Sequence, residues 1–543
     1  MMTAPRQEAS ATRLLDGLAW SVLAIVALVA AFTFRDYGLG WDDYTHSQMG
    51  ELLLSFYASG FTDRRALSFV NLYMYGGGFD MLAALAAKVS PFDLFETRRL
   101  VGAAVGILGL VITWRIGRRV AGPLAGLLAL IFLAACPLYY GHMFMNPKDA
   151  PFAVAAAFFL LCFIPAIERY PAPSPVAVMM LGIGLGLTIG TRIMGGIIGI
   201  SAALGLAILV FLEAGTHGKG RALKRLGQFI AYLIPGALIA YLTMALIWPW
   251  SVQEPLNPIR AIGYFSNFFE KPWKELFAGS LISVPDMPAI YLPTLLFLKL
   301  PEIMVVCALG GLIIAGMRAT DSRLSHQQRS VNVVVVAAIL VPVVMTVLTR
   351  PALYNGVRHF LFLLPPAAVL AGISAAWVIE RAKQMSRPLA YAVTAVATLG
   401  ILSPVVEMVR LHPYQYAHFN RIAGGIDAAD KRYMLDYWGL SFKQATQELR
   451  SKLAERVEVP PDGRRWKIAV CGPHPPASVA LGPQFEATWD SKGADFALTL
   501  NAFYCRELDA PVLVEIKREG VVFARAYDIR GRDIGPLLTM PPP

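Results

Sequence analysis

Apolar stretches long enough to cross a bilayer, about 18 residues or more, recur along the first three quarters of the chain. Because lipid offers no hydrogen bonds to a backbone, such stretches must fold as helices. The composition agrees, since 56% of the 543 residues are hydrophobic and 16% are charged. Most of the chain therefore cannot be an ordinary water-soluble globule. We predict about eleven spans, at 16–34, 99–116, 124–141, 151–167, 176–190, 193–213, 227–248, 290–317, 331–348, 359–378 and 389–410.

The formal net charge of +11 is explained by basic residues that fall on alternate loops. By the positive-inside rule these loops face the cytoplasm, which also places the N-terminus inside. We therefore expect a multi-pass protein of a bacterial inner (plasma) membrane, with membrane lipids and no nucleic acid among its partners. The first apolar stretch lacks a cleavage site and is predicted to be a retained span. The basic loops contain Arg115, Arg118, Arg119, Lys219, Arg221, Lys224, Arg225, Arg318, Arg323, Arg329, Arg381, Lys383 and Arg387.

The opposite, extracytoplasmic face carries nearly all of the unusual polar residues. In its first loop, amphipathic spacing predicts helices on the membrane surface over 44–57 and 82–89. We divide the chain into a transmembrane module, 1–411, and an extracytoplasmic domain, 412–543. The segments expected on this face are the first loop 35–98, turns near 142–150 and 190–193, the middle loop 249–289, the turn 349–358 and the tail from 411.

The tail is predicted to be a small α/β domain. Ser441 to Ala454 has a helical pattern, Trp466 to Cys471 is typical of a strand, and Val512 to Tyr527 is typical of a hairpin. Cys471 and Cys505 both fall in this domain, where an extracytoplasmic location would permit a disulfide. Spacing alone does not say whether the two cysteines pair.

Two adjacent carboxylates, Asp42 and Asp43, follow directly after the first span, and His46 lies close behind them. A carboxylate or an imidazole within hydrogen-bond reach of an acceptor hydroxyl can act as a general base. The alternative is that the two Asp residues cap the amphipathic helix that follows, as Asp often does at a helix start.

A second charged pair, Lys148 and Asp149, occupies a turn of a few residues between two spans. Charges so close to the hydrocarbon are costly and usually functional. Lys148 could bind a phosphate, and Asp149 could orient the first-loop site or, together with His46, bind an acceptor. The alternative is that Asp149 caps the next helix, with Pro151 in its first turn.

Further cations interrupt the positive-inside pattern at the extracytoplasmic ends of later spans: Arg192, Arg350, Arg358 and His359. Arginine suits bidentate contacts with phosphate. Arg192 and Arg358, with the neighbouring His359 and with Lys148, are therefore candidates for binding a phosphate group. The alternative is that these side chains extend to lipid headgroups.

Two tryptophans of the middle loop, Trp250 and Trp273, could stack on a sugar ring or could belong to an interfacial belt of aromatic residues. The histidines His142, His412 and His418 are scattered, and no tight cluster of metal ligands stands out. We assign no metal site and no cofactor from the sequence, and leave a divalent metal ion as an open alternative.

The order and topology of these features resemble the membrane-embedded C superfamily of glycosyltransferases (GT-C), which includes protein O-mannosyltransferases and lipid A aminoarabinose transferases. The resemblance rests on Asp42–Asp43, Lys148–Pro151 and the basic segment from Arg358 to Pro365. The segments 412–425 and 436–441 after the last span are similar to bacterial members of glycosyltransferase family 39.

This resemblance implies a GT-C fold and an enzyme that moves a hexose or pentose from a polyprenyl-phosphate donor to a hydroxyl of a lipid, glycan or protein acceptor. It implies that the reaction inverts the anomeric centre and that Asp42, or Asp43 if the register differs by one, is the base. A multi-span transporter or flippase of a lipid-linked or anionic substrate is the alternative. It fits less well, because transporters usually show related halves and charges near the bilayer midplane.

Overall fold

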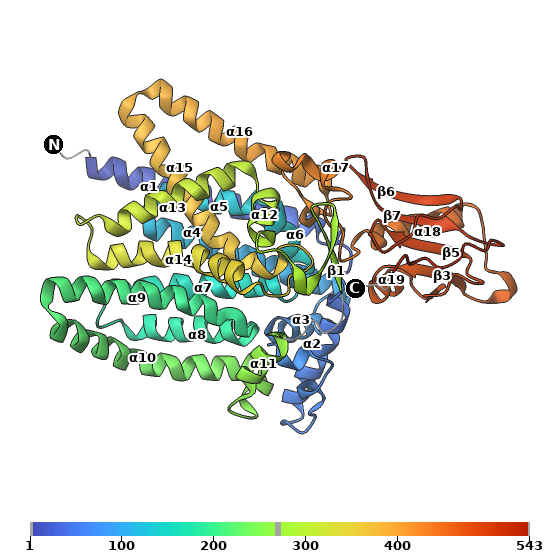
Figure 1. Cartoon of the computed structure of the whole chain (residues 1–543), viewed down its shortest axis with the longest axis horizontal. Helices are drawn as coiled ribbons and strands as arrows, with labels where there is room; N and C mark the ends of the chain where they lie inside the picture. Colours follow the sequence, from blue (N-terminus) through green and yellow to red (C-terminus); the bar gives the residue numbers. More distant parts are fainter. Residues whose placement is uncertain (1–3, 267–272, 541–543) are drawn as a thin grey trace.

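The structure is a computed structural model that describes residues 4–266 and 273–540. A bundle of helices carries a small sheet domain at one end (Figure 1). Among the described residues, nine helices are long and apolar enough to cross a membrane. They are α1 (Ala4–Thr33), α4 (Leu94–Ala121), α7 (Asp149–Glu168), α9 (Gly196–His217), α10 (Lys219–Ile247), α13 (Glu302–Thr320), α14 (His326–Thr349), α15 (Leu364–Met385) and α16 (Arg387–Leu411).

All eleven predicted segments correspond to helices, but two of them are interrupted. The segment 124–141 forms α5 (Pro123–Ala134) and α6 (Pro137–Met145), which meet at a bend of 63°. The segment 290–317 is divided at Pro301 into α12 (Tyr291–Lys299) and α13. Proline lacks a backbone N–H and its ring clashes with the preceding turn, so it is best tolerated in the first turn of a helix and can kink or break a helix elsewhere. The predicted segment 176–190 forms the shorter apolar helix α8 (Pro175–Thr191), which packs between α7 and α10.

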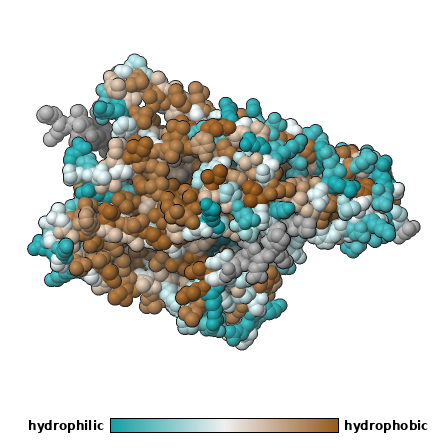
Figure 2. Space-filling view, in the orientation of Figure 1, coloured by the Kyte–Doolittle hydropathy of each residue, from teal (hydrophilic) through white to brown (hydrophobic). Residues whose placement is uncertain are grey.

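The connections α9–α10, α13–α14 and α15–α16 lie at the end of the bundle that also holds the N-terminus, opposite the sheet domain (Figure 1). These connections carry most of the predicted cytoplasmic basic residues. Hydrophobic side chains cover the bundle between its two ends on the face shown in Figure 2. We call the end that carries the sheet domain the tail-side end.

The long loops of the tail-side end are folded. The first loop contains the two predicted helices, which pack against each other, and the second of them also packs against α4. The middle loop contains a short helix and an antiparallel hairpin. The elements are α2 (Asp43–Ala58) and α3 (Gly78–Ala87) in the first loop, and α11 (Asn257–Ser266), β1 (Lys274–Phe277) and β2 (Ser280–Ser283) in the middle loop.

The tail forms a five-stranded mixed sheet in the order β4-β3-β5-β7-β6, in which β3 is parallel to β4 and β5 and the other pairs are antiparallel. Its helix, first strand and hairpin confirm the three elements predicted from the sequence. The elements are α17 (Gly425–Ala429), α18 (Ser441–Glu455), β3 (Trp466–Cys471), α19 (His474–Leu481), β4 (Phe485–Thr488), β5 (Phe496–Leu500), β6 (Val512–Arg518) and β7 (Val521–Asp528).

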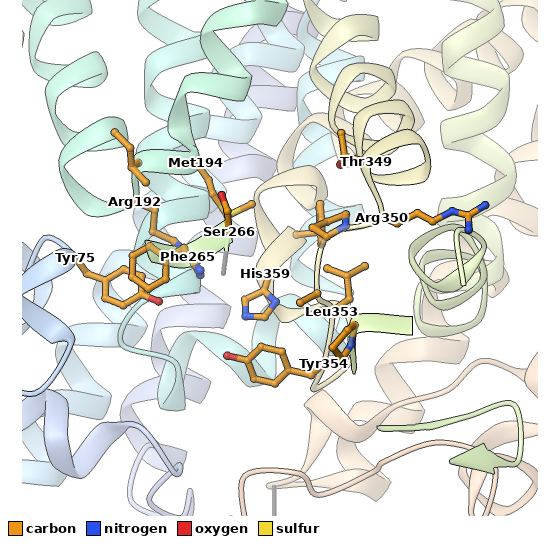
Figure 3. A pocket seen from close by; sticks show the side chains of 15 residues that line it. Tyr75, Arg192, Met194, Phe265, Ser266, Thr349, Arg350, Leu353, Tyr354 and His359 are labelled. Atoms are coloured by element: carbon orange, nitrogen blue, oxygen red, sulfur yellow. The ribbon is translucent and has the colours of Figure 1, made fainter. Parts of the chain in front are cut away.

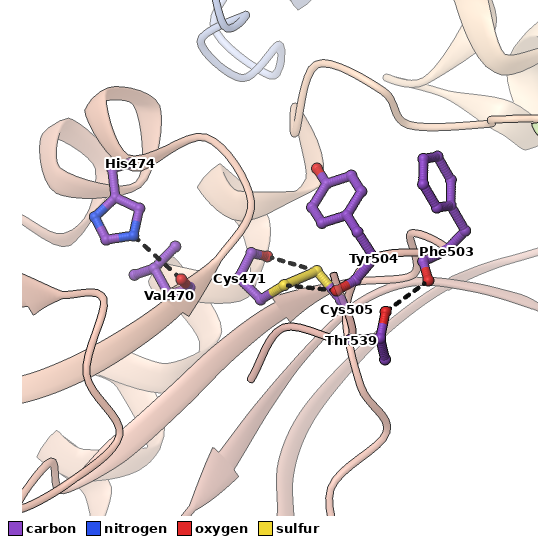
Figure 4. The surroundings of a disulfide bond; sticks show 7 residues. All are labelled: Val470, Cys471, His474, Phe503, Tyr504, Cys505 and Thr539. Carbon is purple, nitrogen blue, oxygen red and sulfur yellow. Dashed lines mark hydrogen bonds between the residues drawn. A yellow bond between two sulfur atoms is a disulfide. The ribbon is translucent and has the colours of Figure 1, made fainter. Parts of the chain in front are cut away.

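Cys471, the last residue of β3, forms a disulfide with Cys505, with their Cα atoms 5.8 Å apart (Figure 4). The pairing that the sequence left open is therefore present in the structure. The bond ties the sheet to the loop that carries Tyr504, a residue that reaches the candidate site described below.

The first loop and the tail are in close contact. A Cβ atom added to Gly38 would lie 2.1 Å from the carbonyl oxygen of Leu440, and one added to Gly40 would lie 2.8 Å from the ring of Trp438. Only glycine allows so close an approach at these two positions. The turn that precedes Asp42 is thereby held against the tail.

Candidate active site

Asp42 lies in the turn between α1 and α2, and its carboxylate faces a cavity. It occupies the N-cap position of α2 but makes no capping hydrogen bond through its side chain. One carboxylate oxygen lies 3.3 Å from Nζ of Lys148 and 3.6 Å from a guanidinium nitrogen of Arg358. The side chain is 27% exposed, so a ligand in the cavity could reach it. The helix-cap interpretation is therefore not supported for Asp42.

Asp43 has a different environment, although it is the next residue. Its carboxylate accepts a hydrogen bond of 2.7 Å from Nε of Arg98. Arg98 also donates to Asp80 at 2.7 Å, and Nδ1 of His46 lies 2.7 Å from the second oxygen of Asp80. All four side chains are buried. We call Asp43, His46, Asp80 and Arg98 the buried network; it joins α2, α3 and α4.

Neither Arg98 nor Asp80 is among the candidates selected from the sequence. A signal was present for Arg98, because it is a cation at the extracytoplasmic end of a predicted span. That is the criterion by which Arg192 and Arg358 were selected. Burial opposes ionisation of Asp80, but the charges of His46 and Arg98 outweigh it and lower the pKa of that carboxyl. The network is therefore a buried cluster of hydrogen-bonded polar and charged groups.

The second charged turn brings three parts of the chain together. Asp149 is buried at the first residue of α7, and its carboxylate accepts a hydrogen bond of 3.2 Å from Arg358 and forms an ion pair with Arg192. Lys148 is the N-cap residue of α7 and makes no capping bond through its side chain, while the side-chain oxygen of Asn146 accepts from the backbone N–H of Asp149 at 2.8 Å. Asp149 thus forms ion pairs with cations from two later turns, Arg192 and Arg358, and is also the first residue of a helix.

We call Asp42, Lys148, Asp149, Arg192 and Arg358 the carboxylate–cation cluster. Three of its members carry positive charge and two carry negative charge, so the cluster has a net positive charge when all are ionised. Burial lowers the pKa of Lys148, against the effect of Asp42. Burial also opposes ionisation of Asp42, but Lys148 and Arg358 outweigh it and hold the pKa of that carboxyl well below its usual range.

Two cavities meet at this cluster. The larger, about 770 Å³, is lined by Arg192 and His359 and by residues at the end of α14 and in the turn after it. Figure 3 shows Tyr75, Tyr354 and His359 turned toward the same space. The smaller cavity, about 210 Å³, is lined by Asp42, His46, Lys148 and Arg358. Tyr75 and Tyr354 line both cavities, which therefore adjoin.

The walls of the smaller cavity come from the loops and from the tail. The first loop contributes Trp41 and Asp42, the middle loop contributes Trp273 and Glu275, and the tail contributes Met434, Tyr437, Trp438 and Tyr504. The larger cavity instead lies against the ends of the long helices. A ligand in the smaller cavity would therefore meet the soluble domain, and one in the larger cavity would meet the bundle.

The two tryptophans selected from the sequence have different positions. Trp273 lines the smaller cavity, with its ring 5.8 Å from that of Tyr354. Trp250 packs edge-to-face against Tyr73 at 5.2 Å and lines neither of the two cavities. Glu275, also in the wall of the smaller cavity, was not selected from the sequence. Among the residues that the structure describes, no group of three or more His, Cys, Asp or Glu side chains is placed to hold a metal ion.

Comparisons with known proteins agree with this fold. Residues 78–250 match the family described as dolichyl-phosphate-mannose-protein mannosyltransferase. The fold matches that of ArnT from Cupriavidus metallidurans in the apo state with a TM-score of 0.50 and 14% identity, over 95% of this chain and 98% of that chain. A comparison with curated protein sequences gives no significant match.

The Archaeoglobus fulgidus oligosaccharyltransferase is also similar, with a TM-score of 0.49 and 14% identity over 83% of this chain. The present chain spans only 62% of the length of that protein. The protein is thus a polytopic helical membrane protein with a GT-C fold. Residues 78–250 thus resemble a mannosyltransferase family, and nearly the whole chain has a fold similar to that of ArnT.

Proposed function

We propose that the chain transfers a sugar from a polyprenyl-phosphate donor to an acceptor hydroxyl, with inversion at the anomeric carbon. The observation that carries this proposal is a carboxylate, Asp42, that faces a cavity while two cations, Lys148 and Arg358, lie within 3.6 Å of it. Such a transfer requires a base that takes the proton of the acceptor hydroxyl and a binding site for the leaving phosphate. The donor is further supported by ArnT, which has been solved bound to undecaprenyl phosphate.

In the proposed reaction, Asp42 takes the proton of the acceptor hydroxyl, and the hydroxyl oxygen attacks the anomeric carbon from the side opposite the phosphate. The bond between that carbon and the phosphate oxygen breaks, and polyprenyl phosphate leaves with the electron pair. Lys148, Arg192, Arg358 and His359 bind the phosphate, whose charge increases as it leaves. Asp149 is a positioning residue that holds two of these cations.

A bound phosphodiester would also make Asp42 a stronger base. The phosphate would share Lys148 and Arg358 with Asp42, and the weaker hold of these cations would raise the pKa of the Asp42 carboxyl. A base is most effective when its pKa approaches the operating pH. Donor binding would therefore favour proton removal from the acceptor.

We assign the larger cavity to the donor and the smaller one to the acceptor. The larger cavity adjoins the ends of long apolar helices, where a polyprenyl chain can remain in lipid, and it contains Arg192 and His359. The smaller cavity contains Asp42 and a wall formed by the tail. The acceptor is a hydroxyl of a lipid, a glycan or a protein, and Trp273 could stack on a sugar ring there.

The test of this proposal is transfer by the purified protein in lipid nanodiscs. Radiolabelled hexoses and pentoses, each on polyprenyl phosphate, are supplied with an envelope extract from cells that lack the protein. Transfer requires that label moves to the extract while polyprenyl phosphate is released in equal amount. Absence of transfer from every donor, by protein that binds polyprenyl phosphate, would contradict the proposed reaction.

The donor assignment has its own test. A charge-assisted hydrogen bond is worth about 1.5–3 kcal/mol, which corresponds to a loss in affinity of about 10- to 100-fold. Lys148→Met and Arg192→Met should weaken binding of polyprenyl phosphate by this factor. The matched control Arg260→Met removes an exposed arginine of the middle loop and should bind normally. Equal binding by all three variants would contradict the assignment.

We also propose the orientation and the domain division. The N-terminus and the basic connections lie in the cytoplasm of a bacterial inner membrane, and residues 412–543 form an extracytoplasmic domain beside the module 1–411. The side of the basic connections and the disulfide between Cys471 and Cys505 support this orientation. Reporter fusions at residue 220 and at the C-terminus test it, and a cytoplasmic tail would overturn it.

A further inference from the structure

The hairpin of the middle loop places a second carboxyl group in the wall of the smaller cavity. Glu275 belongs to β1, is 4% exposed, and lines the same cavity as Asp42. Tyr291 of α12 donates a hydrogen bond of 3.2 Å to its Oε1. Hydrogen bonds from the backbone of Asn355 and Gly356 also act on this carboxyl. Glu275 is therefore fixed in position by two separate elements.

Charged and titratable groups from several parts of the chain face Glu275. Burial opposes ionisation of Glu275, whereas hydrogen bonds from Asn355, Gly356 and Tyr291 and the charge of Arg358 favour it. Burial has the larger effect and raises the pKa of Glu275 to about 7. The other titratable groups that face it are Lys299 and Tyr291 of α12, Tyr437 of the tail, and Asp42 and Lys148 across the cavity.

We propose that Glu275 is a second acceptor-binding group, which donates a hydrogen bond from its protonated carboxyl to an oxygen of the acceptor while Asp42 takes the proton of the reacting hydroxyl. This inference rests on the proposed transfer reaction and adds a residue that determines how the acceptor binds. The two carboxyl groups have different roles because their surroundings differ. Asp42 lies beside two cations and is ionised, whereas Glu275 is buried against Tyr291 and is a hydrogen-bond donor when protonated.

Ionisation of Glu275 would weaken acceptor binding for two reasons. The ionised carboxylate can only accept hydrogen bonds, so the bond to an acceptor ether or carbonyl oxygen is lost. Its charge would also attract Arg358, which the donor phosphate and Asp42 share. A group with a pKa raised to about 7 is protonated below that pH and ionised above it. Acceptor binding should therefore weaken as the pH rises through 7.

The experiment measures the apparent KM for the acceptor extract at pH 6 and pH 8, with saturating donor. For one titrating group with a pKa near 7, the ratio of ionised to protonated forms predicts a rise in KM of about tenfold between these values. Glu275→Gln keeps the shape and a hydrogen-bond donor but cannot ionise, so its KM should not change with pH. Glu275→Asp still titrates and should keep a pH-dependent KM, at a higher level.

Glu254→Gln is the matched control, because Glu254 lies in the same loop with its side chain 58% exposed, and it should behave like the wild type. If Glu275→Gln retains the pH dependence of the wild type, the role assigned to Glu275 is wrong while the transfer reaction stands. If the wild type transfers no sugar at either pH, the transfer reaction itself is wrong. The result we expect is a KM for the acceptor that does not change with pH for Glu275→Gln, beside a pH-dependent KM for the wild type and for Glu254→Gln.

Discussion

Replacing Arg98 with methionine should destabilise the protein more than any single substitution of an exposed residue. Arg98 is 1% exposed on its side chain and holds Asp43 and Asp80 at 2.7 Å each. Its removal leaves two buried carboxylates without their shared cation. Removal of one partner from a buried ion pair typically costs about 3–5 kcal/mol, and two carboxylates are left here, so we expect at least this loss.

The assay is unfolding of the protein in mixed micelles by a denaturing detergent, together with the thermal midpoint. Arg115→Met is the matched control, because Arg115 is an exposed arginine at the other end of the same helix, and surface changes usually stay within about 0.5 kcal/mol. Adding Asp43→Asn and Asp80→Asn to Arg98→Met should restore part of the lost stability, since the uncompensated charges are then absent.

Unfolding of Arg98→Met at the same denaturant concentration as Arg115→Met would contradict this prediction. A triple variant less stable than Arg98→Met alone would contradict it too, because unpaired buried charge would then not be the cause. A loss of transfer by Arg98→Met is expected as well, since the network joins α2, α3 and α4 and includes Asp43, the residue next to Asp42.

Two further changes test other parts of the structure. Replacing Cys471 and Cys505 by serine opens a loop with a sequence separation of 34 and should cost about 4 kcal/mol of stability in the tail, measured by thermal unfolding and by proteolysis; an unchanged protease resistance would contradict this. Asp149→Asn removes the anion between Arg192 and Arg358, so the two cations should separate, and the KM for the donor should rise by about tenfold or more. An unchanged donor KM would mean that Asp149 does not position them.

Regular structure in this chain could be predicted because its causes are local. The apolar stretches predicted all eleven helical segments, and alternation with a central turn predicted the hairpin of β6 and β7. The breaks at Pro137 and Pro301 have a local cause too, but the apolar runs continue across both prolines. Hydropathy averaged over a long window therefore predicted one continuous helix in each case, where the proline breaks the helix in two.

Side-chain partners in the site could be predicted only in part. Asp42, Lys148, Asp149, Arg192 and Arg358 stood out because charges at the ends of apolar spans are rare, and the structure brings them together. The partner of Asp43 lies 55 positions away, in α4, and no local pattern joins them.

Glu275 was missed for a different reason. It lies in a loop of mixed composition, where a glutamate is expected at the surface. Only the folded hairpin places it inside a wall of the cavity.

The choice between the two adjacent carboxylates is the most direct test of the account. The measurement is a single-turnover transfer rate for Asp42→Asn and Asp43→Asn, with polyprenyl phosphate binding checked for each. Loss of a general base typically lowers the rate about 10²- to 10⁴-fold, which we predict for Asp42→Asn. Asp43→Asn keeps an oxygen for Arg98 and should lose less than about tenfold. Near-normal transfer by Asp42→Asn, with a large loss in Asp43→Asn, would contradict the account.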